Sequence, residues 1–169
     1  ELMCKYLGLP ISVNSKKNYD LIKVKKAKKI KPLNYRIPSD ISSAAFLIVL
    51  VTLSNNSKLL IKDVNINTSR IGVVTILKRM GVNIKFKNKK NYKGELIADI
   101  FVSSAKKIKA INCPSKFNTA AIDEFLLLFL VAAKAKGISH FKGLAELNQK
   151  ESPRLMWGSK ILTKMGVKN

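Results

Sequence analysis

The stretch PSDISSAAFLIV (residues 38–49) returns in altered form as PSKFNTAAIDEF (residues 114–125). Both open on Pro-Ser, contain a pair of alanines and lead into an apolar run. In the same order, LKRMGVN (residues 77–83) returns as LTKMGVK (residues 162–168). Self-similarity at a regular spacing indicates a repeated unit, here of about 80 residues, which is too long for one repeat of a solenoid. The chain therefore contains two copies of a domain-building unit.

The composition is that of a folded protein with enough apolar material for a core: 47% of the 169 residues are hydrophobic. The longest apolar stretches, residues 44–53 and 125–133, are much shorter than the roughly 20 residues that a membrane-spanning helix needs. They predict buried helices. The two cysteines, Cys4 and Cys113, are far apart and form no CxxC pair, so neither a disulfide framework nor a metal site is predicted. A cytoplasmic location fits this cysteine usage best.

The formal net charge of +22 is the most unusual feature of the composition. Such a charge is typical of nucleic-acid-binding proteins. Phosphate-binding surfaces favour arginine, however, and the lysines here are scattered through every segment with few aromatic residues between them. We interpret the charge as a solvated lysine-rich surface that attracts small anionic substrates, and keep a basic nucleic-acid-binding module as the alternative. The only arginines are Arg36, Arg70, Arg79 and Arg154.

Turn residues and apolar periodicity predict a regular succession of elements. The second copy stops before its last strand pair and the chain begins within a helix, so we expect a fragment of βαβαββ units with material missing at both ends. Ser39 or Asp40 is expected to cap the helix that follows Pro38. The helix that begins at this cap is predicted to end at residue 53. The other predicted helices cover residues 2–8, 69–81, 119–137 and 152–166. Strands are predicted over residues 20–25, 57–64, 82–87, 95–104, 107–113 and 138–143.

Asp123 and Glu124 are the only acids in a predicted helix that is otherwise apolar on nearly all sides. This places at least one carboxylate at the mouth of a buried element. Acids in a first helical turn can also serve only to complement the helix dipole. The residues themselves leave both interpretations open.

A second group of charges, Lys150, Glu151 and Arg154, lies at the start of the last predicted helix. We expect Ser152 to cap this helix and Pro153 to occupy its first position. A cation, an acid and a guanidinium would then gather where free backbone N–H groups favour anions. An ordinary capped helix with surface charges is the alternative.

Five motifs together resemble the 3-phosphoshikimate 1-carboxyvinyltransferase (EPSP synthase) family, in matching order across nearly the whole chain: IPSDISSAAFLIV, NTSRIG, ADIFVSS, IDEFLLLFLVAAKAKG and LAELNQKESPRL. The resemblance implies an α/β (α+β) fold, an inside-out α/β barrel built from βαβαββ units in a two-domain enzyme with its site between the domains. Residues 1–36 would end the first domain. Residues 37–169 would supply two units of the other domain, the second of them incomplete.

The activity that the resemblance implies is transfer of the enolpyruvyl group of phosphoenolpyruvate to the 5-hydroxyl of shikimate 3-phosphate, with release of phosphate and without a cofactor or metal. Asp123 resembles the proton acceptor that contacts the shikimate hydroxyl, and Glu151 the acid that handles the proton at the methylene carbon. Lys150 resembles a cation near both substrates, and Arg154 the guanidinium that binds phosphoenolpyruvate. These residue types suit the chemistry, because a base must reach the hydroxyl, an acid must protonate the alkene and bidentate cations hold anions.

The remaining expectations concern partners and nearby residues. The resemblance implies two small anionic substrates, no nucleic acid, no membrane and a monomer when the protein is complete. UDP-N-acetylglucosamine enolpyruvyl transferase is the alternative within the same fold. Ser42 and Ser43 are expected to be structural, His140 to be a packed or surface residue, and Cys113 to be a core residue.

Overall fold

The first part of the chain is a short helix, α1 (Leu2–Tyr6), and an antiparallel hairpin of β1 (Ile11–Ser15) and β2 (Asp20–Val24). The helix ends where Gly8 takes a positive φ of 74°, so the predicted helix end is confirmed. The strand β1 was not predicted, although its sequence ISVNS alternates apolar and polar residues. The computed structural model describes residues 2–27, 29–30 and 32–168.

A three-stranded antiparallel sheet supports the rest of the chain. It consists of β3 (Lys58–Asn65), β4 (Asn83–Tyr92) and β5 (Glu95–Ser103), with β5 in the centre. A two-residue turn in which Lys93 and Gly94 both have positive φ joins β4 to β5, which is the geometry that matches the twist of a hairpin. The three strands predicted for the first copy are confirmed.

A buried carboxylate, Asp99, holds the centre of this sheet where both outer strands are irregular. The pairing registers of β3 and β4 each shift opposite β5 near this residue. Asp99 accepts hydrogen bonds from the backbone N–H of Asp63 at 3.0 Å, the amide of Asn88 at 2.8 Å and the ammonium of Lys62 at 3.1 Å. These bonds, with the backbone N–H of Asp63 first, lower the pKa of Asp99 to about 2.

The helix predicted after Pro38 is α2 (Ile41–Leu53). Asp40 is its N-cap and accepts a hydrogen bond from the backbone N–H of Ser43 at 2.8 Å, as expected for a cap of this type. Ser39 forms an isolated parallel bridge with Val64 of β3. The first copy therefore begins with a very short strand and follows the predicted βαβαββ order.

The second helix of the first copy, α3 (Gly72–Arg79), begins later than the predicted range of 69–81. Its last turn is closed by Gly81, which has a positive φ of 93°. Arg70 and Ile71, which were expected within the helix, instead form the turn that leads into it. Arg70 is thereby placed at the N-terminal end of α3.

The continuous helix predicted over residues 119–137 is wrong. The segment is broken into α4 (Asn118–Ala121), the 3₁₀ turn η2 (Ile122–Glu124) and α5 (Phe125–Ala133). The backbone of α4 lies directly against Gly72 of α3, and Ala121, beside this contact, has a non-helical φ of −134°. Ala45 and Ala121, from the alanine pairs of the two copies, are nevertheless both fully buried, although Ala45 lies within α2 and Ala121 is the last residue of α4.

The strands predicted over residues 107–113 and 138–143 are also wrong as regular strands. Among the described residues, the two segments meet in parallel at one isolated bridge, between Asn112 and His140, and a second bridge joins Lys109 to Lys136. The ladder is interrupted because the backbone N–H of Ile111 bonds to the side chain of Ser139 and not to a backbone carbonyl.

The cap expected for the last helix, α6 (Arg154–Lys164), is wrong. Pro153 and not Ser152 is the N-cap, and the side chain of Asn148, from outside the helix, accepts a hydrogen bond from the backbone N–H of Met156 in the first turn at 3.2 Å. Because Pro153 has ψ of 76°, it lies outside the helix, and Arg154 is the first helical residue.

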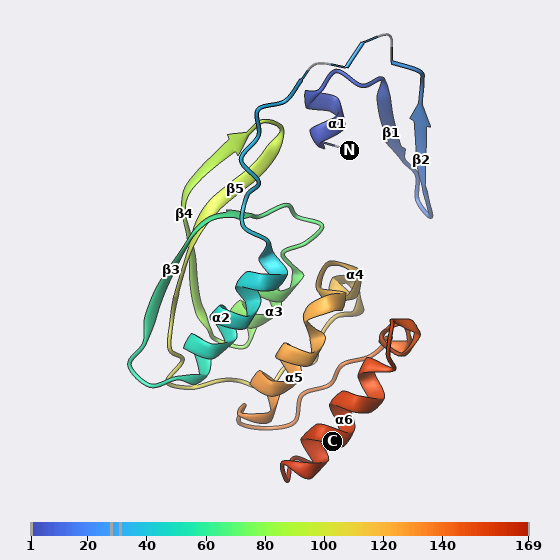
Figure 1. Ribbon diagram of the computed structural model, residues 1–169. Helices are drawn as coiled ribbons and strands as arrows, with labels where there is room; N and C mark the ends of the chain where they lie inside the picture. Colours follow the sequence, from blue (N-terminus) through green and yellow to red (C-terminus); the bar gives the residue numbers. More distant parts are fainter. Residues whose placement is uncertain (1, 28, 31, 169) are drawn as a thin grey trace.

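The elements lie in successive layers (Figure 1). The β3-β5-β4 sheet is covered on one face by α2 and α3, α4 and α5 lie beyond these helices, and α6 is outermost. A single hydrophobic core joins the two copies, with Ile48, Leu77, Ile100, Phe125 and Leu128 among its fully buried side chains. The mixed α/β class predicted from the sequence is confirmed. In the described part of the chain, no helix combines the length and apolar character needed to cross a membrane.

Candidate active site

Asp123 lies at the centre of a group of charged side chains that come from four separate segments. Its Oδ1 atom is 3.5 Å from Nζ of Lys150 and 3.3 Å from Nη1 of Arg154. Its Oδ2 atom is 3.9 Å from Nη1 of Arg70. The Asp123 side chain is 34% exposed, so the carboxylate is accessible while three cations surround it.

Arg154 connects Asp123 to the second candidate acid. Nη1 of its guanidinium donates to Asp123, and Nη2 donates to Oε2 of Glu151 at 2.7 Å. The hydrogen bond from Arg154 lowers the pKa of the Glu151 carboxyl. The Glu151 side chain is 78% exposed. One planar guanidinium therefore holds two carboxylates, one of them partly shielded and the other open to solvent.

Lys150 precedes α6 and has two acidic neighbours. It faces Asp123, and its Nζ atom also lies 3.8 Å from Oε1 of Glu146 on the short η3 turn (Ala145–Gln149). The Lys150 side chain is only 26% exposed, so its ammonium is directed into the group and not outward into solvent. The four residues selected from the sequence, Asp123, Lys150, Glu151 and Arg154, are brought together.

Two glycines let neighbouring helices approach the broken α4–α5 segment from either side. A Cβ atom on Gly72 of α3 would lie 2.6 Å from the backbone carbonyl of Ala120, and one on Gly158 of α6 would lie 2.6 Å from a methyl group of Leu126. These close approaches bring the start of each helix beside Asp123. The two starts carry Arg70 and Arg154, respectively.

Glu124, the neighbour of Asp123, is buried and bonds to α2. Only 3% of its surface is exposed, and its carboxylate accepts a hydrogen bond from the hydroxyl of Ser42 on α2. Burial raises the pKa of the Glu124 carboxyl. Glu124 is the N-cap residue of α5, yet its side chain makes no capping bond. The arrangement of the two acids thus does not follow from the helix dipole alone.

Sequence reasoning missed the contributions of Arg70 and Ser42. Arg70 lies within the NTSRIG motif but received no role, and Ser42 was expected to be structural. Ser42 is bonded to both Arg70 and Glu124, whereas Ser43 bonds only to the capping Asp40. The scarcity of arginine in a lysine-rich chain was the available signal for Arg70. No sequence signal distinguished the two serines.

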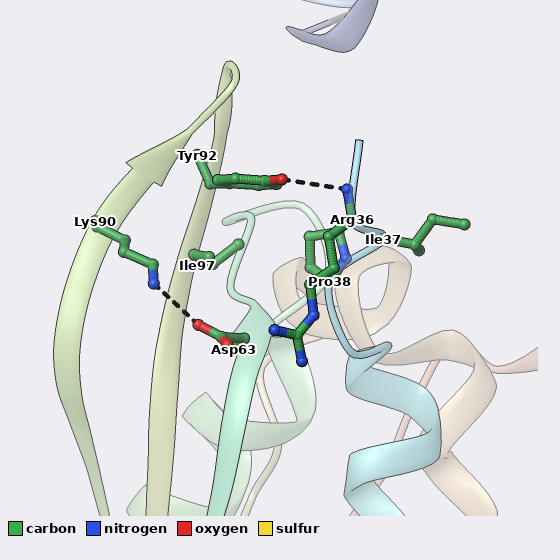
Figure 2. Close-up of a pocket in the computed structure, with 7 residues that line it drawn as sticks. All are labelled: Arg36, Ile37, Pro38, Asp63, Lys90, Tyr92 and Ile97. Atoms are coloured by element: carbon green, nitrogen blue, oxygen red, sulfur yellow. Dashed lines mark hydrogen bonds and ion pairs between the residues drawn. The ribbon is translucent and has the colours of Figure 1, made fainter. Parts of the chain in front are cut away.

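A separate hollow of about 130 Å³ lies where the chain enters α2. Figure 2 shows the Lys90 ammonium reaching Asp63 at 3.1 Å, and the Tyr92 hydroxyl accepting a hydrogen bond from the backbone N–H of Arg36 at 3.1 Å. None of the four selected residues lines this hollow. Its contacts fasten the segment before α2 to the far end of the sheet.

The other singled-out residues take no part in the charged group. Cys113 is buried and unpaired, as expected of a core residue, and burial raises the pKa of its thiol. His140 is exposed on the second of the irregular segments. Within residues 2–27, 29–30 and 32–168, no group of three or more His, Cys, Asp or Glu side chains could hold a metal ion.

The arrangement can support acid–base chemistry on an anionic substrate. A carboxylate surrounded by cations can accept a proton from a substrate hydroxyl. Arg154 and Lys150 supply the N–H donors that bind carboxylate or phosphate groups. The exposed Glu151 is a second group that can exchange a proton.

Comparison with known proteins shows which family the chain belongs to. The family model of EPSP synthase (3-phosphoshikimate 1-carboxyvinyltransferase) matches residues 1–169. The 3-phosphoshikimate 1-carboxyvinyltransferase of Zymomonas mobilis is 38% identical over 99% of this chain and 37% of the relative, and that of Ruthia magnifica is 37% identical over 100% of this chain and 38% of the relative.

A solved EPSP synthase from Acinetobacter baumannii has a TM-score of 0.85 and 36% identity, covering 95% of this chain and 35% of that structure. The present chain therefore spans under two fifths of the length of the curated relatives described above. The family match nevertheless extends over all of the chain. The chain belongs to the EPSP synthase family.

Proposed function

We propose that the complete gene product transfers the enolpyruvyl group of phosphoenolpyruvate to the 5-hydroxyl of shikimate 3-phosphate and releases phosphate. The observation that carries this proposal is the position of Asp123 between Arg70, Lys150 and Arg154. Both substrates are anions, so three cations around one carboxylate combine substrate attraction with a proton acceptor.

Each residue has a distinct role in this proposal. Asp123 accepts the proton of the 5-hydroxyl as that oxygen attacks phosphoenolpyruvate. Glu151 delivers a proton to the methylene carbon and later removes one when phosphate leaves. Arg154 binds phosphoenolpyruvate through its fork, whose five N–H donors exceed the two used in contacts with Asp123 and Glu151. Lys150 neutralises charge between the two substrates.

The domain division belongs to the same proposal. Residues 1–36 would end one enolpyruvyl transferase domain, and residues 37–169 would supply two units of the other. The separate hairpin β1–β2 and the single core that joins α2 to α5 support this division. The free cysteines Cys4 and Cys113 fit a cytoplasmic protein. We also propose that the protein is a monomer that binds neither nucleic acid nor membrane. Light scattering would check the monomer, and a measurement of salt-dependent DNA binding would check the absence of nucleic-acid binding.

The test is phosphate release by the complete gene product when phosphoenolpyruvate and shikimate 3-phosphate are supplied together. Asp123→Asn should lower kcat by about 10²- to 10⁴-fold with a smaller change in KM, because the amide keeps the shape but cannot accept the proton. Asp20→Asn, at an exposed position of β2 outside the site, is the matched control and should leave both parameters unchanged.

Two results would contradict the proposal. Turnover with UDP-N-acetylglucosamine in place of shikimate 3-phosphate would assign the chain to the other enolpyruvyl transfer reaction. Near-normal turnover of Asp123→Asn would show that Asp123 is not the base.

A further inference from the structure

The buried carboxylate of Glu124 has no direct part in the proposed chemistry. The two copies of the unit show that the fold does not require a carboxylate at this place. Glu124 is the eleventh residue of PSKFNTAAIDEF, and the eleventh residue of PSDISSAAFLIV is Ile48, which is fully buried. Replacing such an apolar residue by a buried acid costs stability unless the acid is well bonded. A function for Glu124 should therefore be sought in its contacts.

The direction of the hydrogen bonds around Ser42 follows from the groups involved. The guanidinium of Arg70 can only donate, so Nη2 of Arg70 donates to Oγ of Ser42 at 3.0 Å. The hydroxyl has a single proton, which it donates to Oε1 of Glu124. Glu124 is thus the acceptor of this hydrogen bond.

The other side of the Arg70 guanidinium faces the site. Nη1 is 3.9 Å from Oδ2 of Asp123, while the Arg70 side chain is 50% exposed. A half-exposed arginine keeps one position only if a second contact holds it. In the described structure, Ser42 supplies that contact from α2, an element that contributes no group to the proposed chemistry.

We propose that Glu124 and Ser42 are positioning residues that act through Arg70. The buried carboxylate orients the hydroxyl, the hydroxyl fixes the guanidinium, and the guanidinium holds Oδ2 of Asp123 so that Oδ1 remains directed toward Lys150 and Arg154. This inference rests on the proposed function, in which Asp123 is the base.

The first test compares Ser42→Ala with Ser43→Ala in the complete gene product. Ser43 is the adjacent, exposed serine that bonds to Asp40 outside the site. Ser42→Ala should lower kcat about tenfold, with KM for both substrates within about twofold, because a misoriented base slows the reaction without removing a substrate contact. Ser43→Ala should stay within about twofold in both parameters. Equal effects of the two substitutions, or a change in KM alone, would overturn the proposal.

The second test asks whether Ser42 acts through Arg70. The double variant Ser42→Ala/Arg70→Ala should be no slower than Arg70→Ala alone, because the hydroxyl has nothing left to position. Multiplicative effects of the two substitutions would contradict this route. Glu124→Ile restores the residue type of the first copy, so we expect lowered kcat with no loss of thermal stability. If the fall in kcat of Glu124→Ile is accounted for by a loss of thermal stability, Glu124 has only a structural role.

A crystal structure of the Ser42→Ala variant provides a measurement that does not depend on the substrate. The guanidinium of Arg70 should leave Asp123, while Lys150 and Arg154 keep their places. An unmoved Arg70 would overturn the positioning role whatever reaction the enzyme catalyses. Failure of the proposed function would instead appear as absence of turnover in the unmodified protein.

Discussion

Gly72→Ala is the substitution that most directly tests how the helices place Asp123. A Cβ atom at this position would lie 2.6 Å from both the carbonyl carbon and the oxygen of Ala120 and 2.8 Å from the backbone nitrogen of Ala121. Ordinary contacts of a Cβ atom begin at 3.4 Å. All three neighbours are backbone atoms, so no side-chain rotation can relieve the overlap, and α3 and α4 must move apart.

The size of the effect follows from this geometry. Overpacking of a closely packed interior costs about 1–3 kcal/mol, and rigid backbone neighbours place Gly72→Ala toward the upper end. The displacement also shifts η2, which carries Asp123 directly after α4. A misplacement of about 1 Å in an active site can lower the rate about 100-fold, so we expect kcat to fall by about one to two orders of magnitude.

Gly158→Ala is the matched control, because its Cβ atom would also lie 2.6 Å from a neighbour. That neighbour is a terminal methyl group of Leu126, which can rotate away. Alanine within α6 also favours the helix by about 1 kcal/mol over glycine. We therefore expect little net change in stability.

The assay is urea-induced unfolding together with phosphate release, performed on the complete gene product for both variants. Gly72→Ala should have the lower unfolding midpoint and the lower kcat. If the two variants behave alike in both measurements, the close approach of α3 to α4 does not place Asp123, and the reasoning is refuted.

Three further predictions concern the sheet, the fork and the isolated chain. Asp99→Asn should lower the thermal stability at pH 7. The difference from the unmodified protein should shrink as pH falls from about 4 toward 2, because Asp99 has a lowered pKa of about 2 and its stabilising charge is lost over that range. A difference in stability that does not depend on pH in scanning calorimetry would contradict this. Arg154→Lys should raise KM for phosphoenolpyruvate more than about tenfold in steady-state kinetics, because an ammonium cannot bridge Asp123 and Glu151 while binding an anion bidentately. An unchanged KM would show that the Arg154 guanidinium does not bind phosphoenolpyruvate. The 169-residue chain by itself should release no phosphate, because it spans only 37% of a relative such as the Zymomonas mobilis enzyme and a partial site cannot orient both substrates. Measurable turnover of the purified chain would show that the rest of the length found in such relatives is not needed.

The sequence by itself determined the features that depend on neighbouring residues. The duplicated Pro-Ser segments predicted two units, Asp40 capped α2, and Gly8 and Gly81 ended their helices, because caps and positive φ angles are local properties. The order of strands and helices in the first copy followed from apolar periodicity. The four selected site residues lie close together in the structure, and the sequence could single them out because acids within an apolar segment and an arginine among lysines stand out by type.

The tertiary structure decided the features that depend on contacts between distant segments. The break between α4 and α5 lies where the backbone meets Gly72, and it could not be read from a segment that is rich in the strong helix formers alanine and leucine. The same holds for the different burial and different partners of Asp123 and Glu124. The contacts of Ser42 with Arg70 and Glu124, which are 28 and 82 residues away, have no local signature. Local residue preferences determine where elements begin and end, whereas close packing between helices determines which of their side chains meet.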